Sequence, residues 1–402
     1  MDKGIVRSQH DQVLFIAICV LTAIGLVMVY SASYAYASLT DADPEGVLRR
    51  QLTAVGLGLV ALLVLSYVPS KTLYCLAPVS GIVAMVLLLL ALGRQVGPEE
   101  TKRFITLIPG LTLQPSTIGS VALISCLAAL GHWYAGIEDR YGRFVAIGLS
   151  ATAGMCLLIL VAPNLSTTLL TATTAIVVLL IAGLKPRDFL CSVGFVVLGG
   201  AIAAWTTSYM GKRIAEHLAL LRGEEPGYQV THALIGLGSG GALGKGLCRG
   251  VEKFGYLPEV HNDMIFAAIG EELGLVMTLL IVALYGLVLI RGFRAALGAP
   301  TLFGRYLAAG LTTLITAQAV INMLVVTAMV PVTGLPLPFV SAGGTSVAVL
   351  LGAAGLILSV SREYTEEPRE VADRRADTDS NRGNGRTRVS GSGRGRFASR
   401  IG

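Results

Sequence analysis

QVTHALIGLGSGGALGKGLCRGVEKFGYLPEVHNDMIFAAIGEELG, residues 229–274, joins a glycine-rich polar segment to the start of a long apolar one. Its glycines stand among apolar residues and turn signals, unlike the Ser- or Pro-rich runs of a linker, so we expect an ordered loop. The polar part ends at Asp263, at the edge of the apolar span. We expect the chemistry of the protein at this loop.

The rest of the chain is strongly apolar. Hydrophobic residues make up 53% of the 402 residues, charged residues make up 14%, and the mean hydropathy is +0.70. This composition is typical of polytopic membrane proteins. No small-residue cleavage site follows the first apolar segment, so we expect it to remain as a helix. Spans of about 20 apolar residues, enough to cross a hydrocarbon core of about 30 Å, number about ten: 12–34, 52–69, 73–93, 117–135, 144–162, 165–184, 188–206, 264–290, 306–330 and 345–361.

The predicted fold is therefore an all-α polytopic membrane protein with a large extracytoplasmic loop between the seventh and eighth helices. By the positive-inside rule, basic residues in the loops on the N-terminal side place both termini in the cytoplasm. Residues 1–11 are the predicted cytoplasmic N-terminus, 12–362 the transmembrane domain, 207–263 the extracytoplasmic loop within it, and 363–402 a cytoplasmic tail. The basic residues behind this orientation are Lys71, Arg140, Arg143, Lys185, Arg187, Arg291, Arg294 and Arg305.

The tail is too polar to form a core, so we expect it to be disordered. It is either simply solvated or in contact with anionic lipid headgroups or a cytoplasmic partner. The net charge of +6 comes partly from this tail and does not indicate a nucleic-acid partner. Cysteines fall mostly in or beside apolar spans, so neither a disulfide framework nor a metal cluster is predicted.

Two segments interrupt the apolar pattern. PVTGLPLPFVSAGGTS, residues 331–346, is either a tight turn between two helices or irregular backbone buried in the protein. APNLSTTL, residues 162–169, reads as a turn and a helix start with Asn164 as the N-cap.

Basic residues stand in the other sizeable outer loop, residues 93–117. Lys102 and Arg103 lie just outside a span, where cations suit a phosphate-bearing lipid headgroup or a generic interfacial anchor.

Asp263 also has two readings from local sequence, because an Asp before a long apolar helix suits an N-cap as well as a catalytic site.

Three blocks resemble the signature motifs of one family. GYQVTHALIGLGSGGALGKGL (227–247), GYLPEVHNDMIFAAIGEELGL (255–275) and GLPLPFVSAGGTS (334–346) resemble those of the SEDS proteins, named for shape, elongation, division and sporulation. The resemblance covers residues 12–362, and GLVMVYSAS (25–33) is similar to the division member. It implies a membrane glycosyltransferase that polymerises lipid II into β-1,4 glycan strands and releases polyprenyl pyrophosphate during septal cell-wall synthesis.

The resemblance also implies roles for particular residues. Asp263 matches the essential Asp of the family and would be the general base for the acceptor 4-hydroxyl, although a role in binding metal or substrate stays open. Lys102 and Arg103, with Lys245 as a further candidate, would face the pyrophosphate. The remaining candidates for substrate binding are Gln114, Ser116, Gln229, Ser239, Gly240, Gly241, Glu259, His261, Ser341, Gly343, Gly344 and Thr345.

This chain departs from the family pattern at several polar positions. The family usually has Glu where Thr117 stands, a Lys near Ser120, a PDLG-like motif at Asn164, and Tyr at Ala342. Such losses would remove charges or hydrogen-bonding groups near the membrane, where these groups are usually functional. We therefore expect reduced or partner-dependent activity as one outcome.

Three functions remain in competition. An inverting glycosyltransferase in the bacterial cytoplasmic membrane would act with a class B penicillin-binding transpeptidase, other cell-division proteins and membrane lipids. A lipid II transporter or flippase would use similar broken helices, and a non-catalytic scaffold would only recruit the transpeptidase. No cofactor is predicted with certainty, and a divalent cation is left open. Charge in this sequence is concentrated in outer loops and is scarce at mid-span, which favours chemistry over transport.

Overall fold

The computed structural model describes residues 5–7, 10–40, 44–93, 105–108, 111–162, 164–206, 208–224 and 227–365. Residues Arg7–Tyr364 form one unit that holds every described helix. The predicted tail beyond residue 365, together with Lys102 and Arg103, lies outside the described residues.

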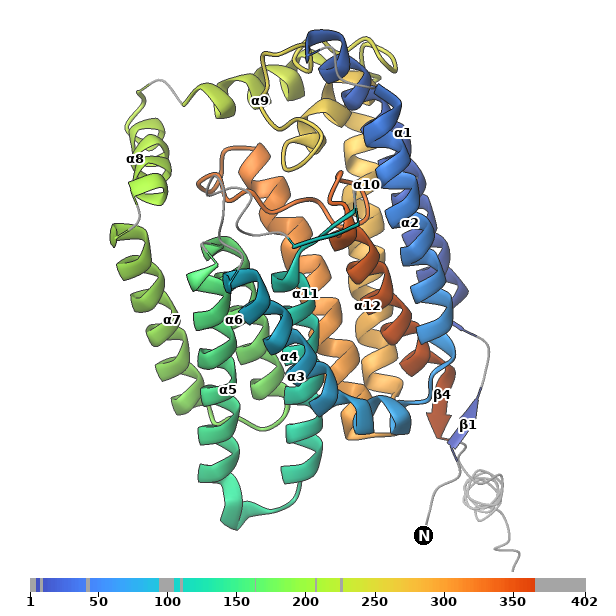
Figure 1. The fold of residues 1–402 in the computed structure, drawn as a ribbon, viewed down its shortest axis with the longest axis vertical. Helices are drawn as coiled ribbons and strands as arrows, with labels where there is room; N and C mark the ends of the chain where they lie inside the picture. The colour runs from blue at the N-terminus through green and yellow to red at the C-terminus, as the bar shows by residue number, and fades with distance from the viewer. Residues whose placement is uncertain are drawn as a thin grey trace, which may run out of the picture. The chain divides into compact units, whose positions relative to one another are not determined.

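Helices dominate the structure (Figure 1). In chain order they are α1 (Gln12–Thr40), α2 (Pro44–Tyr67), α3 (Ser70–Gly93), α4 (Pro115–Tyr134), α5 (Tyr141–Val161), α6 (Leu165–Ile181), α7 (Pro186–Thr206), α8 (Ser208–Leu221), α9 (Tyr228–Ser239), α10 (Ile265–Gly298), α11 (Leu302–Val326) and α12 (Thr345–Arg362), with a 3₁₀ turn, η2, at Glu138–Arg140. The short strands are β1 (Ile5–Arg7), β2 (Ile105–Ile108), β3 (Leu111–Leu113) and β4 (Glu363–Thr365).

The predicted membrane spans are confirmed as helices. Within the described ranges, 9 helices are long and apolar enough to cross a membrane, and α6 is a shorter apolar helix. These correspond to the spans expected from the sequence, so the chain is an all-α polytopic membrane protein. The predicted cap of α6 is also confirmed, because the Asn164 side chain accepts a hydrogen bond from the Thr167 N–H at 3.3 Å.

The bundle has two distinct ends. At the terminal end, where α1 begins and α12 finishes, the Asp11 N–H donates to Ser361 Oγ at 3.3 Å. Arg291 of α10 joins them there through an ion pair with Asp11 at 2.7 Å. The opposite end, here called the loop end, carries α8, α9 and the β2–β3 hairpin (Figure 1). Sequence reasoning predicted neither the two helices in the 207–263 loop nor this antiparallel hairpin, in which Ile105 pairs with Leu113.

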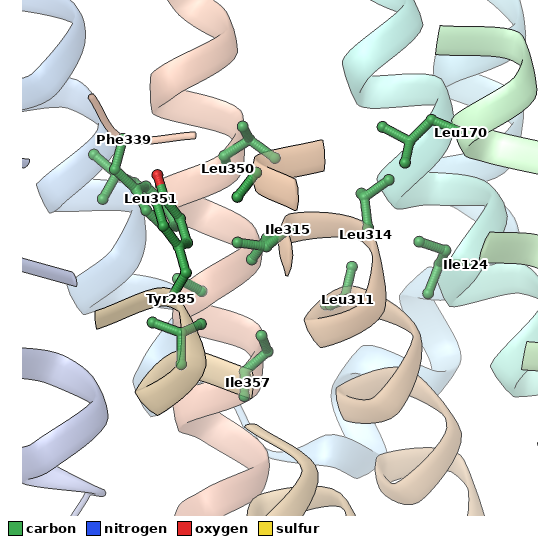
Figure 2. Close-up of a cluster of buried hydrophobic side chains, with 14 of the residues drawn as sticks. Ile124, Leu170, Tyr285, Leu311, Leu314, Ile315, Phe339, Leu350, Leu351 and Ile357 are labelled. Atoms are coloured by element: carbon green, nitrogen blue, oxygen red, sulfur yellow. The ribbon is translucent and has the colours of Figure 1, made fainter. Parts of the chain in front are cut away.

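The segment between α11 and α12 turns back into the bundle. Leu337, Phe339 and Val340 are fully buried, and Phe339 belongs with Tyr285 and Leu351 to a buried apolar cluster (Figure 2). We call residues 331–344 the re-entrant segment. Of the two readings of this segment, burial is correct and a simple turn is wrong.

Side chains from several helices satisfy the carbonyl groups of the re-entrant segment. Irregular backbone inside a membrane protein needs such partners, since no bulk water can supply them. The donors and their acceptors are Arg213 of α8 to Val332 O (2.9 Å), Ser166 of α6 to Thr333 O (2.6 Å), Asn322 of α11 to Leu335 O (2.8 Å), Gln318 of α11 to Pro336 O (2.8 Å), Tyr285 of α10 to Pro338 O, and Gln51 of α2 to Ser341 O (3.2 Å).

Helix α10 is broken near the loop end. Gly274 has φ 75° and ψ −173°, which divides α10 into a half-helix, residues 265–273, and a long helix, residues 275–298. Backbone of residues 241–246 fills the break, so that N–H and C=O groups freed there keep partners. The bonds are Leu275 N to Gly241 O (3.0 Å), Val276 N to Ala242 O (3.2 Å), Lys245 N to Glu271 O (2.9 Å) and Gly246 N to Glu272 O (2.9 Å).

We predict that Gly274→Ala destabilises the protein. A Cβ at this position would overlap Ala242 O and Gly244 N, and the positive φ is itself unfavourable for Ala. The free energy of unfolding should fall by about 2 kcal/mol or more, measured as a lower thermal unfolding midpoint in detergent.

Gly286→Ala is the matched control. Gly286 lies in the same helix, and a Cβ there would meet nothing within 4 Å. This variant should leave the midpoint unchanged or slightly raised. Equal midpoints for the two variants would contradict the described break in α10.

Candidate functional site

Asp263 lies directly before the half-helix but does not cap it. The N-cap is Met264, and no side chain makes the cap hydrogen bond. Asp263 as a residue is 7% exposed, and its Oδ1 is buried without a hydrogen-bond partner. The N-cap reading is therefore wrong, because the Asp263 carboxylate accepts no hydrogen bond from the first turn of the helix. A buried polar atom without a partner is costly and is a common mark of a functional site.

The re-entrant segment forms the wall against which Asp263 packs. A Cβ built on Gly334 would lie 3.8 Å from both Asp263 Oδ2 and Arg213 Nη1, so the carboxylate and the guanidinium border the same backbone position. Asn322 then ties the two segments together, since its Nδ2 donates to Asp263 O at 2.7 Å and to Leu335 O at 2.8 Å. The backbone of Asp263 is thus fixed to α11 and to the re-entrant segment.

The turn before Asp263 is held in an unusual conformation. Glu259 has φ 52°, which is uncommon for a residue with a side chain. Asn262 donates to it twice, from its backbone N–H to Glu259 O at 2.9 Å and from Nδ2 to Oε2 at 2.5 Å. His261 O accepts from Ala342 N at 2.8 Å, which joins this turn to the end of the re-entrant segment. Backbone strain of this kind often accompanies functional sites.

Burial controls the ionisation of the site. Burial raises the pKa of Asp263 to about 6, against the opposing effect of the Arg213 charge, while Glu259 raises it further. Burial lowers the pKa of His261, and the Glu259 charge opposes that shift. Asp263 therefore changes its charge close to neutral pH, as a general base should.

A second group of predicted residues meets where α4 begins beside the start of α12. Gln114 binds the C-terminal end of the last motif block, because its N–H donates to Thr345 Oγ1 at 3.3 Å and its Oε1 accepts from Ser346 Oγ at 2.5 Å. Ser116 accepts from Asn164 Nδ2 at 3.3 Å. Gln114 and Ser346 border a small recess inside the bundle with both polar and apolar walls. Its lining residues are Gln114, Thr117, Ser120, Thr167, Leu170, Leu314, Gln318, Leu335, Pro336 and Ser346.

Some departures from the family pattern form neutral hydrogen bonds in this recess. Thr117 Oγ1 donates to Gln114 Oε1 at 3.3 Å, and Ser120 Oγ lies 2.5 Å from Thr171 Oγ1. Ser341, Gly343 and Gly344, the other candidates of the last block, lie in the non-helical stretch before α12. Ser341 Oγ accepts a hydrogen bond from Leu337 N at 2.8 Å, so this hydroxyl stabilises the backbone of the re-entrant segment.

The glycine-rich candidates pack against the half-helix. Gly240 lies against the backbone of Gly270, leaving no room for a side chain, whereas Gly241 borders open space. Ser239 Oγ donates to Gly236 O at 3.1 Å, and Gln229 is half-buried on α9. Lys245 Nζ donates to Glu271 Oε1 at 2.7 Å, so its charge is paired with a carboxylate of the half-helix. The remaining candidate cations, Lys102 and Arg103, lie outside the described residues.

Sequence reasoning missed several residues that shape the site. Arg213 and Asn322 come from α8 and α11 and carry no local motif. Glu271 and Glu272 did carry a signal, because adjacent carboxylates at the start of an apolar helix are costly unless they are paired; each is 1% exposed. In the part of the chain that the structure describes, no group of three or more His, Cys, Asp or Glu side chains could hold a metal ion.

We predict that Asp263→Asn stabilises the protein at neutral pH. With its pKa raised to about 6, the folded state holds this proton more tightly than the unfolded state, so stability falls as pH rises from about 4 to 6. At pH 7.5 the variant should gain up to about 3 kcal/mol in unfolding free energy, from a shift of about two pKa units.

Thermal unfolding in detergent at pH 4 and pH 7.5 measures this gain, which should vanish at pH 4. Asp188→Asn is the control, since Asp188 lies at the terminal end and accepts from Tyr141 Oη at 2.5 Å. An Asp263→Asn variant that is less stable than the native chain at pH 7.5 would show that the buried carboxylate stabilises the fold.

Comparison with known proteins agrees with this architecture. The chain matches the FtsW/RodA/SpoVE family, described as cell cycle protein, over residues 11–366. It is 36% identical to stage V sporulation protein E of Bacillus subtilis over 363 residues, covering 89% of this chain and 98% of that protein. It is 34% identical to the probable peptidoglycan glycosyltransferase FtsW of Geobacter metallireducens, covering 90% and 97%.

Solved structures show the same fold. A chain from a peptidoglycan synthase complex, studied for its coordination of polymerization and crosslinking, matches with a TM-score of 0.69, 27% identity and coverage of 88% of this chain and 98% of that one. The rod shape determining protein RodA of Thermus thermophilus matches with a TM-score of 0.64, 28% identity and coverage of 88% and 97%. With its motif blocks gathered around Asp263 and the re-entrant segment, this chain belongs to the FtsW/RodA/SpoVE family of multi-pass membrane proteins.

Proposed function

We propose that this protein is an inverting peptidoglycan glycosyltransferase that polymerises lipid II during septal cell-wall synthesis. The observation that carries the proposal is the buried Asp263 carboxylate, whose Oδ1 has no hydrogen-bond partner and whose pKa is raised to about 6. Relatives named as peptidoglycan glycosyltransferases support the general activity.

The reaction needs one base and one site for the leaving group. Lipid II carries its sugar through an α-linked pyrophosphate, and a β-1,4 product requires inversion in a single displacement. The acceptor 4-hydroxyl attacks the donor anomeric carbon, its proton passes to the Asp263 carboxylate, and polyprenyl pyrophosphate leaves. A carboxylate with a pKa near 6 is ionised at neutral pH and basic enough to accept this proton.

Positive charge would stabilise the departing pyrophosphate. We assign this role to Lys102 and Arg103, and we expect Arg213 to set the charge balance beside Asp263. The synthase complex among the structural relatives supports a class B transpeptidase as the partner. By the positive-inside rule, the loop end of the bundle would face out of the cytoplasm.

Polymerisation of fluorescent lipid II by the purified chain with its transpeptidase tests the proposal. The native complex should form glycan strands, and Asp263→Asn should lower the rate by at least about 100-fold, because loss of a general base typically costs 10²–10⁴-fold. Asp188→Asn makes the same chemical change at the terminal end and should retain native activity.

The transpeptidase alone should form no polymer. Polymer that persists with Asp263→Asn would refute the role of Asp263 as the base. A folded native complex that binds lipid II without polymerising it would instead favour a transporter or a scaffold.

A further inference from the structure

A buried ionic cluster holds the half-helix that directly follows Asp263. Glu272 lies at the far end of this helix and is 1% exposed. Its carboxylate accepts from Lys253 Nζ at 2.5 Å, from Cys248 N at 2.9 Å and from Ser31 Oγ at 2.8 Å. Lys253 Nζ also donates to Ser31 Oγ at 2.7 Å. The cluster thus joins α1, the loop before Asp263 and the half-helix.

The neighbouring carboxylate binds the same loop. Glu271 Oε1 accepts from Lys245 Nζ at 2.7 Å and from Val251 N at 2.8 Å, and its Oε2 accepts from Glu252 N at 3.2 Å. Buried charges paired in this way add little net stability compared with apolar residues. They fix one geometry, however, because breaking any pair leaves a charge buried without a partner.

We propose that Lys253, Glu272 and Ser31 are positioning residues for Asp263. They hold the half-helix, and through it the Asp263 carboxylate, in the reactive arrangement. The half-helix is about 13 Å long at 1.5 Å per residue, and the break at Gly274 separates it from the rest of α10. A displacement at Glu272 therefore passes along the half-helix to the Asp263 side chain, while Asn322 holds the Asp263 carbonyl beside the re-entrant segment. This inference rests on the proposed glycosyltransferase function.

The size of the effect follows from the geometry of catalysis. A reacting group displaced by about 1 Å can cost about 100-fold in rate. Displacement would also change what surrounds the carboxylate, namely Arg213 from α8, Glu259 and His261 from its own loop, and the Gly334 backbone. Admitting water would lower the pH midpoint of activity, since burial is the main cause that raises it.

The sharpest test compares two serines of α1 in the lipid II assay with the full chain and its transpeptidase. Ser31→Ala removes a bond to Glu272, whereas Ser33→Ala removes a buried hydroxyl that has no hydrogen-bond partner in the described structure. Ser31→Ala should lower kcat by about 3- to 10-fold with KM within about threefold, and Ser33→Ala should match the native chain.

Substitutions of the charges extend the test. The double variant Lys253→Met with Glu272→Gln removes both charges, avoids an unpaired one, and should lower kcat by about 100-fold. Its pH midpoint for kcat/KM should fall by about half a unit or more. A loss of folded protein alone would reduce the apparent kcat but leave this midpoint in place. Lys253→Arg, which keeps the charge, should retain more activity than Lys253→Met.

The outcomes separate this inference from the proposed function. No polymer from the native complex would overturn the proposed function. An active native complex in which Ser31→Ala and the double variant keep native kcat and pH midpoint would overturn the positioning role alone. If the double variant does not fold, the Ser31 and Ser33 pair decides.

Discussion

The architecture depends on satisfying backbone polar groups where helices are interrupted within the bundle. Two interruptions lie at the two ends of the half-helix. The re-entrant segment packs against Asp263 just before its start, and the break at Gly274 follows its end. Side chains of α2, α6, α8, α10 and α11 bind carbonyl groups of the first, and the backbone of residues 241–246 binds the second. Because unsatisfied groups would be costly in this setting, these bonds fix several helices around one site.

The same arrangement explains why Asp263 is suited to accept a proton. Its backbone is held by Asn322, while its side chain is buried with one oxygen left without a hydrogen bond. Burial favours the protonated form and raises the pKa to about 6. Burying the ionised carboxylate costs folding free energy, and the carboxylate belongs to the residue that matches the essential Asp of the family motif. A costly buried group at such a position is expected of a functional residue.

Sequence reasoning predicted the features of the fold that depend on neighbouring residues in the chain. Hydropathy located the spans, and the Asn164 cap followed from residue type. Local reasoning offered an N-cap role for Asp263 as one reading, and the structure assigns the cap to Met264. The ionic cluster could not be predicted, because Lys253 and Ser31 lie 19 and 241 residues from Glu272. No local pattern marks such partners, although two adjacent carboxylates at the start of an apolar helix indicate that partners must exist.

The pH dependence of lipid II polymerisation by the native complex tests the role of Asp263 most directly. If the buried carboxylate is the base, kcat/KM should rise as pH increases through about 6, the raised pKa of Asp263, and level off above pH 7. A rate that stays constant between about pH 5 and 8 would contradict the account, since a base with this pKa changes its charge within that range.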